Sequence, residues 1–376
     1  MIYGYTATFV FYLLAFLLIA FFLFSKIRYR IISVNDETDE RISSQSNPEL
    51  NLPRIGITMG DAAGIGAEVI LKALSDEKIN RICRPIIIGD ESFLRKTARD
   101  LGLNFDFANA SKNLSPDSNQ TPVYNLNNLS GEITAGAESA ATGKACAEYI
   151  ETAVKLWREK KIDAMATAPI SKKALALGGY DFPGHTEFLA HLTDTKEFAM
   201  SFFAGDLRVV LLSTHVSLRD AIELVKKEKL VELIRFSHRA ISRLLKKDAR
   251  IAVAGLNPHA SEGGMFGAEE ENEIEPAVKE CREKYGIDAS GAFSPDTIFL
   301  RGYKGEFDAV ISCYHDQATI AVKCLSFGAS VNVTLGLPLV RTSVDHGTAL
   351  DIAGRGVADA SSMKTAIELA AKLVNI

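Results

Sequence analysis

The chain has 376 residues, long enough for two lobes with substantial cores, and its hydrophobic (47%) and charged (24%) fractions are ordinary for a globular protein. A formal net charge of -5 and a pI near 5.9 give no basic field, which argues against nucleic acid as a partner. The five cysteines are odd in number and no pair has CxxC spacing, so we predict reduced thiols, not disulfides or a thiolate metal site.

The first 25 residues carry no charge and are mostly aliphatic or aromatic, and three basic residues follow at Lys26, Arg28 and Arg30. This length suits a helix that crosses the hydrocarbon core with the downstream chain on the cytoplasmic side. We therefore predict a transmembrane helix at 1–25, a flexible polar tether at 26–52, and a cytoplasmic catalytic region held at the inner face of the membrane. A cleaved signal peptide fits less well because no basic residue precedes the apolar run. A translation start further downstream stays open.

The folded region is predicted to begin near Pro53 and to alternate strands with helices. The strand RIGITM leads into the glycine-rich turn GDAAGIGAE and an amphipathic helix. This turn is neither a Walker loop nor a Rossmann fingerprint, because no GK[ST] follows and Gly64-Ile65-Gly66 lacks a third glycine at the right offset. Asp61 and Glu68 in it are as consistent with caps or solvated side chains as with a function. Further along the chain we predict a strand at 84–90, a surface loop over most of 105–129, and a long helix at 136–160.

Polar side chains follow the next predicted elements. The strand in IDAMATAPISK ends at Thr167, and Lys172 beyond it is expected to be exposed. The segment FPGHTEF places His185 and Thr186 at the start of a helix, where free backbone amides and the helix dipole favour an anionic group.

Three of the seven histidines come where predicted strands end: His215 after a hairpin, His259 in NPH, and His315 in CYH. Neutral imidazoles from separate strand ends suit Zn²⁺, Co²⁺ or a similar divalent ion with a position left open for substrate. A structural role is the more common one for any single histidine, but the shared placement favours a metal site. Such an ion can act as a Lewis acid.

The stretch from Tyr314 to Gly354 is dense in polar groups between apolar runs. Lys323, Asn332 and Arg341 in it suit the carboxylate, hydroxyl or phosphate groups of a small anionic substrate. Open α/β sheets bind their ligands at the carboxyl ends of strands, so we interpret this stretch as half of an active site.

The motifs TMGDAAGIGAE, TAPISK, PGHTEF, STHVSLRD, NPHASEGG, SPDT, YHDQ and VNVTLGLPLVRTSVDHGTALDIAG occur in the order found in 4-hydroxythreonine-4-phosphate dehydrogenases. The chain resembles this NAD(P)-dependent family of pyridoxal phosphate biosynthesis from Pro53 to Ile376. The resemblance implies a fold like isocitrate and isopropylmalate dehydrogenases, with two α/β/α lobes around a cleft and a homodimer. The lobes would comprise 53–180 with 316–376, and 181–315.

Residue by residue, the resemblance implies metal ligation by His215, His259 and His315, one of them supplied across the dimer interface. It implies a role near the metal for Asp296 and proton transfer by Lys323. Substrate-binding residues of the family match His185, Thr186, Lys323, Asn332 and Arg341. The loop HGTALDIAG implies cofactor binding by His346, Gly347 and Asp351.

The reaction implied is oxidation of 4-phosphooxy-L-threonine (4-hydroxythreonine 4-phosphate) by NAD or NADP, assisted by Zn, Co or Mg, with decarboxylation to 3-amino-2-oxopropyl phosphate. The chain departs from the family at Ala62, Ala67 and Ala318 and at Gly291 to Phe293, but no departure removes a ligand or a charged group. Three alternatives stay open: a related dehydrogenase of a dihydrodiol or other hydroxy acid, an enzyme similar to phosphate acyltransferases, and a tethered binding protein without catalysis.

Overall fold

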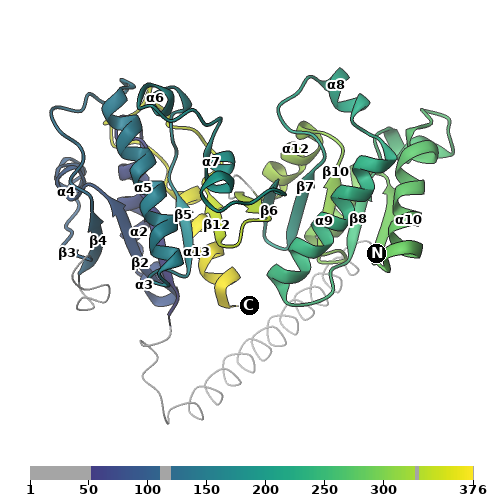
Figure 1. The fold of residues 1–376 in the computed structure, drawn as a ribbon, viewed down its shortest axis with the longest axis horizontal. Helices are drawn as coiled ribbons and strands as arrows, with labels where there is room; N and C mark the ends of the chain where they lie inside the picture. The colour runs from purple at the N-terminus through teal and green to yellow at the C-terminus, as the bar shows by residue number, and fades with distance from the viewer. Residues whose placement is uncertain (1–51, 111–119, 327–329, 376) are drawn as a thin grey trace, which may run out of the picture. The chain divides into compact units, whose positions relative to one another are not determined.

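A twelve-stranded mixed sheet runs through the described part of the chain, in the order β3-β4-β2-β1-β5-β12-β11-β6-β7-β10-β8-β9 (Figure 1). The structure is a computed structural model that describes residues 52–110, 120–326 and 330–375. The strands are β1 (Arg54–Thr58), β2 (Arg84–Gly89), β3 (Phe107–Asn109), β4 (Thr121–Asn125), β5 (Ala164–Thr167), β6 (Ala199–Ala204), β7 (Leu207–Leu211), β8 (Ile251–Ala254), β9 (Ala289–Phe293), β10 (Ala309–Ser312), β11 (Val331–Leu335) and β12 (Val340–Ser343).

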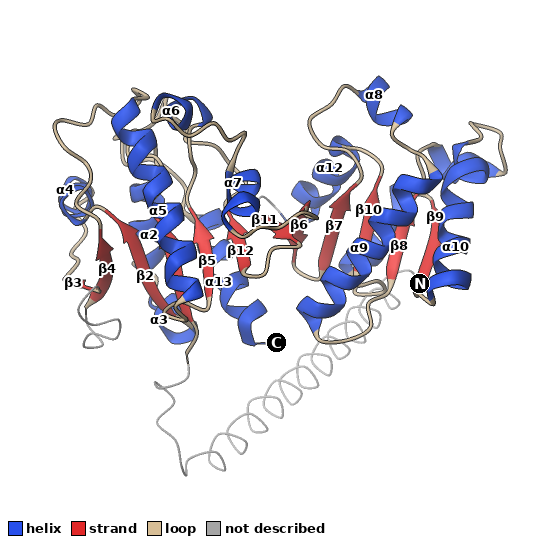
Figure 2. Cartoon of the chain, in the orientation of Figure 1, coloured by secondary structure: helices blue, strands red, loops and turns tan. Residues whose placement is uncertain are grey.

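Helices connect most of these strands (Figure 2). They are α2 (Gly66–Leu74), α3 (Glu77–Ile82), α4 (Glu91–Asp100), α5 (Ala140–Arg158), α6 (Lys172–Leu177), α7 (His185–Leu192), α8 (Leu218–Glu223), α9 (Lys227–Leu245), α10 (Glu275–Tyr285), α11 (Pro295–Tyr303), α12 (His315–Ser326) and α13 (Ser361–Asn375), with a 3-10 turn η2 (Pro258–Glu262) and a π-helical turn η3 (Glu270–Ile274).

The pairing divides the sheet into two parallel halves. Strands β3, β4, β2, β1, β5 and β12 pair in parallel, and so do β7, β10, β8 and β9. Between them, β11 and β6 make the antiparallel connections. Parallel strands need helical crossovers, and helices on both faces bury them completely. Every residue of β5, β7, β8 and β10 is buried, which confirms the predicted α/β class.

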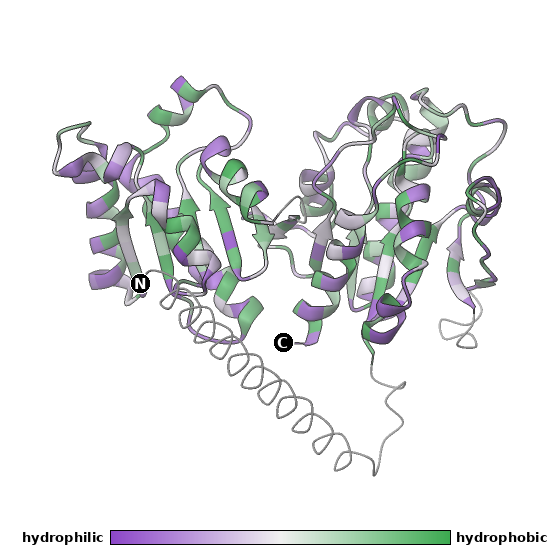
Figure 3. Ribbon diagram, turned by 180° about the vertical axis from the view of Figure 1, so that it is seen from behind, coloured by the Kyte–Doolittle hydropathy of each residue, from purple (hydrophilic) through white to green (hydrophobic). Residues whose placement is uncertain are grey.

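The core of the second half lies on both faces of the sheet. On β7, Val210 packs with Ile251 and Val253 in one cluster, whereas Val209 and Leu211 pack in another. Successive side chains of a strand point to opposite faces, so these clusters are the two sides of one layer. Figure 3 shows the same division by hydropathy, with apolar residues along the strands and polar residues on the outer faces of the helices.

Most of the predicted helices and strands form where the sequence indicated them. The hairpin of β6 and β7 turns at Gly205 and Asp206, and α5 occupies most of the predicted long helix. The predicted loop at 105–129 is wrong in part, because β3 and β4 form there and extend the edge of the sheet. Short strands in a polar segment lack the alternating pattern that reveals longer ones.

The two acidic residues of the glycine-rich segment are buried, so the alternative that they are solvated is wrong. Asp61 is completely buried and Glu68 is 4% exposed. Glu68 pairs with Lys72 at 2.8 Å and accepts a hydrogen bond from the backbone of Ala358, so it joins α2 to the segment before α13. The five cysteines are free, as predicted, and Cys324 is the exposed one among them.

The predicted membrane attachment requires correction. No helix among residues 52–110, 120–326 and 330–375 is long and apolar enough to cross a membrane. The transmembrane helix predicted at 1–25 lies outside the described residues, as does nearly all of the tether at 26–52. The prediction of a membrane-tethered protein rested on those residues alone, and we withdraw it.

Candidate active site

A cavity of about 510 Å³ collects most of the residues that sequence analysis assigned to substrate. Its lining comes from both halves of the sheet and from the loops between them. The predicted site residues in its wall are His185, Thr186, His215, Asn332, Arg341, His346 and Gly347. Segments far apart in sequence therefore meet in one place, at the antiparallel centre of the sheet.

Arg341 on β12 is the central charge of this cavity. Its side chain donates to Thr167 Oγ1 at 2.8 and 3.2 Å, to Thr334 Oγ1 at 3.0 Å and to Asn332 Oδ1 at 3.3 Å. The residue is 3% exposed, and among the described residues it forms no ion pair with a carboxylate. Burial lowers the pKa of Arg341 to about 9, so the group is still protonated at neutral pH. The charge of Glu187 in the cavity wall opposes this lowering without forming an ion pair, and an anionic ligand would offset the cost of the buried cation further.

The start of α7 faces the same cavity. Thr186 Oγ1 lies 3.3 Å from Thr334 Oγ1, which links α7 to β11. His185 Nε2 is buried without a hydrogen-bond partner among the described residues. Burial, and then the charge of Arg341, hold the pKa of His185 well below its ordinary value, so the ring is neutral near pH 7. An unpaired buried ring nitrogen beside an unpaired arginine fits a polar, negatively charged ligand.

His215 and His315 form a pair. Their ring centroids are 5.9 Å apart with the planes tilted by 43°. His315 is the first residue of α12, and its Nδ1 lies 2.8 Å from Asp316 Oδ1. A carboxylate on one ring nitrogen leaves the other free and basic, which is the usual support of a metal-ligating histidine.

His259, the third predicted ligand, lies in the turn that follows β8. It lies in η2 and opens a run of six consecutive residues with positive φ, of which only the last two are glycines: His259, Ala260, Ser261, Glu262, Gly263 and Gly264. Left-handed backbone costs an L-residue roughly 1–2 kcal/mol, so the turn must be held by its surroundings. Within the described chain, no three His, Cys, Asp or Glu residues come together as a metal site. Of the three predicted ligands, His215 and His315 are the two whose rings the structure shows to be neighbours within one chain.

Lys323 and Asp296 do not line the cavity. Lys323 is exposed and lies 3.6 Å from Asp345, whose carboxylate also accepts a hydrogen bond from Ser330 Oγ at 2.5 Å. Asp296 is exposed in the first turn of α11 and accepts a hydrogen bond from Ser294. The structure therefore does not bring these two predicted catalytic groups to the substrate cavity within one chain.

The predicted cofactor loop borders two cavities. Its beginning, at His346 and Gly347, lines the large cavity. Its end, at Gly354 and Gly356, lines a smaller cavity of about 160 Å³ whose other walls include Gly64 of the glycine-rich turn. Asp351 lies between the two ends and is exposed.

Several residues of the cavity were not assigned a role from sequence. Thr167 and Thr334 are the direct supports of Arg341, and Glu187 is the carboxylate in the cavity wall. Lys172 is exposed, as predicted, but it also lines the cavity. The clue to Thr167 was its place at the end of a buried strand, whereas nothing local distinguishes Thr334 within the apolar run of β11.

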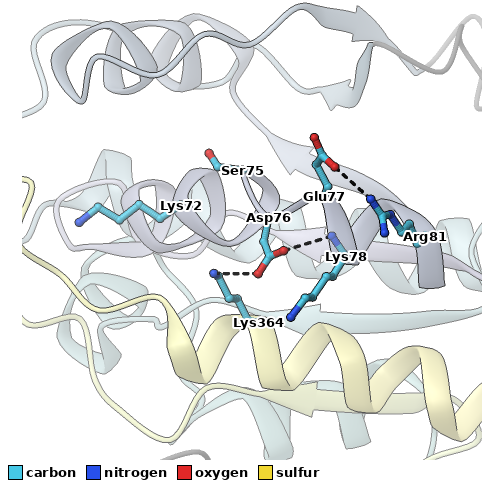
Figure 4. A pocket seen from close by; sticks show the side chains of 7 residues that line it. All are labelled: Lys72, Ser75, Asp76, Glu77, Lys78, Arg81 and Lys364. Atoms are coloured by element: carbon cyan, nitrogen blue, oxygen red, sulfur yellow. Dashed lines mark hydrogen bonds and ion pairs between the residues drawn. The ribbon is translucent and has the colours of Figure 1, made fainter. Parts of the chain in front are cut away.

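A different pocket, at the surface between α2, α3 and α13, is rich in charge (Figure 4). Within it, Lys364 pairs with Asp76 at 3.1 Å and Arg81 with Glu77 at 3.1 Å, and Lys72 pairs with Glu68 at 2.8 Å. Salt bridges at an exposed surface contribute little, and none of the predicted site residues lines this pocket.

Comparisons with known proteins show the family of this chain. The family model "Pyridoxal phosphate biosynthetic protein PdxA" matches residues 81–370. The chain is 45% identical over 325 residues to D-threonate 4-phosphate dehydrogenase from Cupriavidus necator, covering 86% of this chain and 97% of that protein. It is 42% identical over 327 residues to 4-hydroxythreonine-4-phosphate dehydrogenase from Geobacter metallireducens, covering 86% and 96%. The crystal structure of 4-hydroxythreonine-4-phosphate dehydrogenase from Klebsiella pneumoniae matches with TM-score 0.79, 37% identity, and coverage of 86% and 99%.

These matches confirm the resemblance found in the sequence motifs, and with it the prediction of a dehydrogenase. The chain belongs to the PdxA family.

Proposed function

We propose that this protein oxidises a phosphorylated hydroxy acid with a nicotinamide cofactor, and that its substrate is 4-hydroxythreonine 4-phosphate. Hydride from C3 would pass to NAD or NADP and the hydroxyl proton to a base of the protein. The resulting β-keto acid would lose carbon dioxide to give 3-amino-2-oxopropyl phosphate. The observation that carries this proposal is the buried, unpaired Arg341 beside the start of α7.

In this proposal Arg341, His185 and Thr186 bind the phosphate. The guanidinium can donate to phosphate oxygens in a fixed geometry, and the free amides at the start of α7 add further donors. Thr167 and Thr334 orient the guanidinium, and Asn332 Oδ1 accepts one of its hydrogen bonds. The rest of the substrate would then extend toward His215 in the same cavity.

His215 and His315 would hold a divalent ion such as Zn²⁺, Co²⁺ or Mg²⁺, with Asp316 supporting His315. When bound, the ion would supply a Lewis acid that stabilises negative charge developing on the substrate oxygen. We propose that the third ligand, His259, comes from a second copy of the chain.

Exposed apolar side chains support such a homodimer. Val216 and Leu218 follow His215, Met265 and Phe266 follow the His259 turn, and Ile320 lies five residues after His315. Met265 is 72% exposed and Ile320 64% exposed. Apolar groups this exposed, close to incomplete ligand sets, are typical of a surface that another subunit covers.

The roles of Lys323 as proton acceptor and of Asp296 near the metal stay predictions. Both side chains are exposed in one chain, so either would have to reach the substrate in the assembled dimer. The lobe boundaries also stay a proposal. They place the cavity between the lobes, but Phe188 and Leu189 of α7 pack in the core of the first half, so we assign α7 to that lobe.

The nicotinamide cofactor is proposed to follow the loop from His346 to Gly356. His346 and Gly347 border the substrate, where the nicotinamide must lie for hydride transfer, and the smaller cavity at the other end of the loop could take the adenosine. Asp351, exposed between them, would contact the ribose.

D-threonate 4-phosphate is the second candidate substrate. The relative from Cupriavidus necator bears that name at 45% identity. In the cavity wall Glu187 is the single carboxylate, beside the cations Lys172 and Arg341. The second substrate carries a hydroxyl where the first carries an ammonium group, so this positively biased lining suits it well.

The test uses the full-length chain, stripped of metal and resupplied with Zn²⁺, Co²⁺ or Mg²⁺, and follows NADH or NADPH formation with each substrate. Metal-dependent turnover with release of carbon dioxide is expected. A preference for D-threonate 4-phosphate would select the second candidate. Tight metal binding without turnover of either compound would refute both substrates and keep the metal site.

A further inference from the structure

We propose that Glu270 is a positioning residue: its buried carboxylate holds the left-handed turn that presents His259 to the metal. The inference rests on the proposed function, in which His259 is a ligand. It assigns a role to a residue outside the cavity that contacts neither substrate nor cofactor.

The His259 turn needs an external support. Four consecutive non-glycine residues, 259–262, have φ between 47° and 63°. L-residues avoid this region, so a run of them persists only where the surrounding structure fixes it. The turn itself supplies few bonds, chiefly from Ala260 N to Asn257 O at 3.1 Å and from Gly264 N to Ser261 Oγ at 3.2 Å.

Glu270 supplies the fixed point at the base of the turn. Its Oε1 accepts from the backbone amides of Leu256 at 2.8 Å and Asn257 at 2.7 Å, and its Oε2 accepts from Asn257 Nδ2 at 2.8 Å. The residue is 1% exposed, and no ion pair to it is present in the described part of the chain. Three donors on one buried carboxylate hold the two residues that precede Pro258 in a single orientation.

Close packing makes this orientation specific. A Cβ on Gly255 would lie 3.1 Å from Glu270 Oε1 and 3.0 Å from Ala260 Cα. The Glu270 carboxylate and the His259 turn therefore both pack closely against this glycine. Glu270 begins the π-helical turn η3, a distortion that is frequent at functional sites. The first residue of the π-turn therefore places its carboxylate against the backbone that follows β8.

Gln317 connects this support to the histidine pair. Its Nε2 donates to Gly255 O at 2.8 Å, and its Oε1 accepts from Cys313 N at 2.8 Å, two residues before His315. The side chain of Gln317 therefore contacts both the backbone before the His259 turn and the backbone before the helix that begins at His315. Outer contacts of this kind fix the geometry of ligands, and their removal typically weakens metal binding about 10–100-fold.

The experiment titrates the metal-free full-length protein with Co²⁺ and follows the visible spectrum of the bound ion. Glu270→Gln keeps the size of the side chain but turns one acceptor into a donor that faces Asn257 Nδ2. We expect its Co²⁺ affinity to fall about 10–100-fold, toward that of His259→Ala, with an altered spectrum. Glu269→Gln is the matched control, because Glu269 also accepts from Asn257 Nδ2, but its backbone donors are those of Ala268 and Glu269 and not those of the His259 turn. It should bind almost as the wild type does.

Two further variants separate positioning from stability. Val278→Ala opens a cavity in α10 and should lower the free energy of unfolding while leaving Co²⁺ affinity and spectrum unchanged. Asn257→Ala removes one of the three bonds to Glu270 and should weaken Co²⁺ binding to an intermediate degree, which keeps the test valid if Glu270→Gln does not fold. If Glu270→Gln binds Co²⁺ with wild-type affinity and spectrum, the role of Glu270 is refuted while the proposed metal site stands. If Glu270→Gln does not fold, the same result in Asn257→Ala has the same meaning. Absence of Co²⁺ binding by the wild type would overturn the proposed metal site and this inference together.

Discussion

The rings of His215 and His315 lie 5.9 Å apart, centroid to centroid, although a hundred positions separate them in the chain. One follows β7 and the other begins α12 just after β10, and these strands pair in parallel with Leu211 beside Ser312. Their carboxyl ends therefore meet at one edge of the sheet. This neighbourhood is the starting point for the functional predictions.

Replacing either member of the pair should remove metal and activity together. We expect His215→Ala and His315→Ala each to lower kcat/KM at least about 100-fold, because loss of a ligand exceeds the cost of losing an outer-shell contact. Metal content by elemental analysis and turnover are the measurements. His238→Ala is the control, since His238 pairs with Asp248 and neither residue lines the cavity. Full activity in either variant of the pair would exclude it from the metal site.

The proposed sharing of the site between subunits predicts complementation. In a dimer of one His215→Ala and one His259→Ala subunit, one of the two sites keeps all three histidines. Random association should therefore restore about a quarter of wild-type activity, since half of the dimers are mixed and each has one intact site. The two subunits would be co-expressed with different tags, and the purified mixed dimer, with one intact site of two, should show about half of wild-type activity.

The matched control pairs His215→Ala with His315→Ala. These two residues belong to the same chain's half of the site, so no mixed dimer has an intact set and activity should stay absent. Recovery in this control, or none in the first pair, would contradict the sharing of His259.

Arg341 should determine affinity for the phosphate. Arg341→Lys keeps a positive charge but loses the fork that contacts Thr167 and Thr334, so we expect KM for the phosphorylated substrate to rise roughly tenfold or more. The same change should alter turnover of the dephosphorylated compound much less. Arg239→Lys, at an exposed ion pair with Glu197, is the control. Equal effects on both compounds would argue that Arg341 has a structural role only.

Asp308 should make the stability depend on pH. Burial by itself raises the pKa of Asp308, but hydrogen bonds from Arg250 and then Lys247 outweigh it and hold the pKa well below its ordinary value. The folded state therefore binds this proton less readily than the unfolded state. The stabilisation is present above the unfolded pKa of about 4 and is lost as the pH falls below it.

Asp308→Asn should accordingly lower the free energy of unfolding by about 2 kcal/mol at pH 7, because it removes the charge from the hydrogen bonds that Arg250 and Lys247 donate, while both of these cations stay partly solvated. Urea denaturation at pH 7 and near pH 3 is the measurement, and the difference from wild type should narrow at the lower pH. Asp206→Asn, at a more exposed carboxylate, should show little change at either pH. A difference that grows on acidification would contradict the assignment.

The sequence by itself determined the local features of this protein. Its buried strands appear as short apolar runs, and the turns after them carry His215, His259 and His315, because an apolar run that ends in polar residues marks a strand tip. The order of the motifs was sufficient to indicate the family. Asn332 and Arg341 were identified because polar groups between apolar runs are rarely accidental.

The tertiary structure alone decided which of these groups meet. Thr167 supports Arg341 across 174 positions because β5 and β12 happen to pair, and no local period encodes that pairing. It also placed His215 beside His315 and buried Glu270 at the base of the His259 turn. Side-chain periodicity reports which face of an element is buried, but long-range strand order is fixed by packing of the whole core, which one segment of sequence cannot reveal.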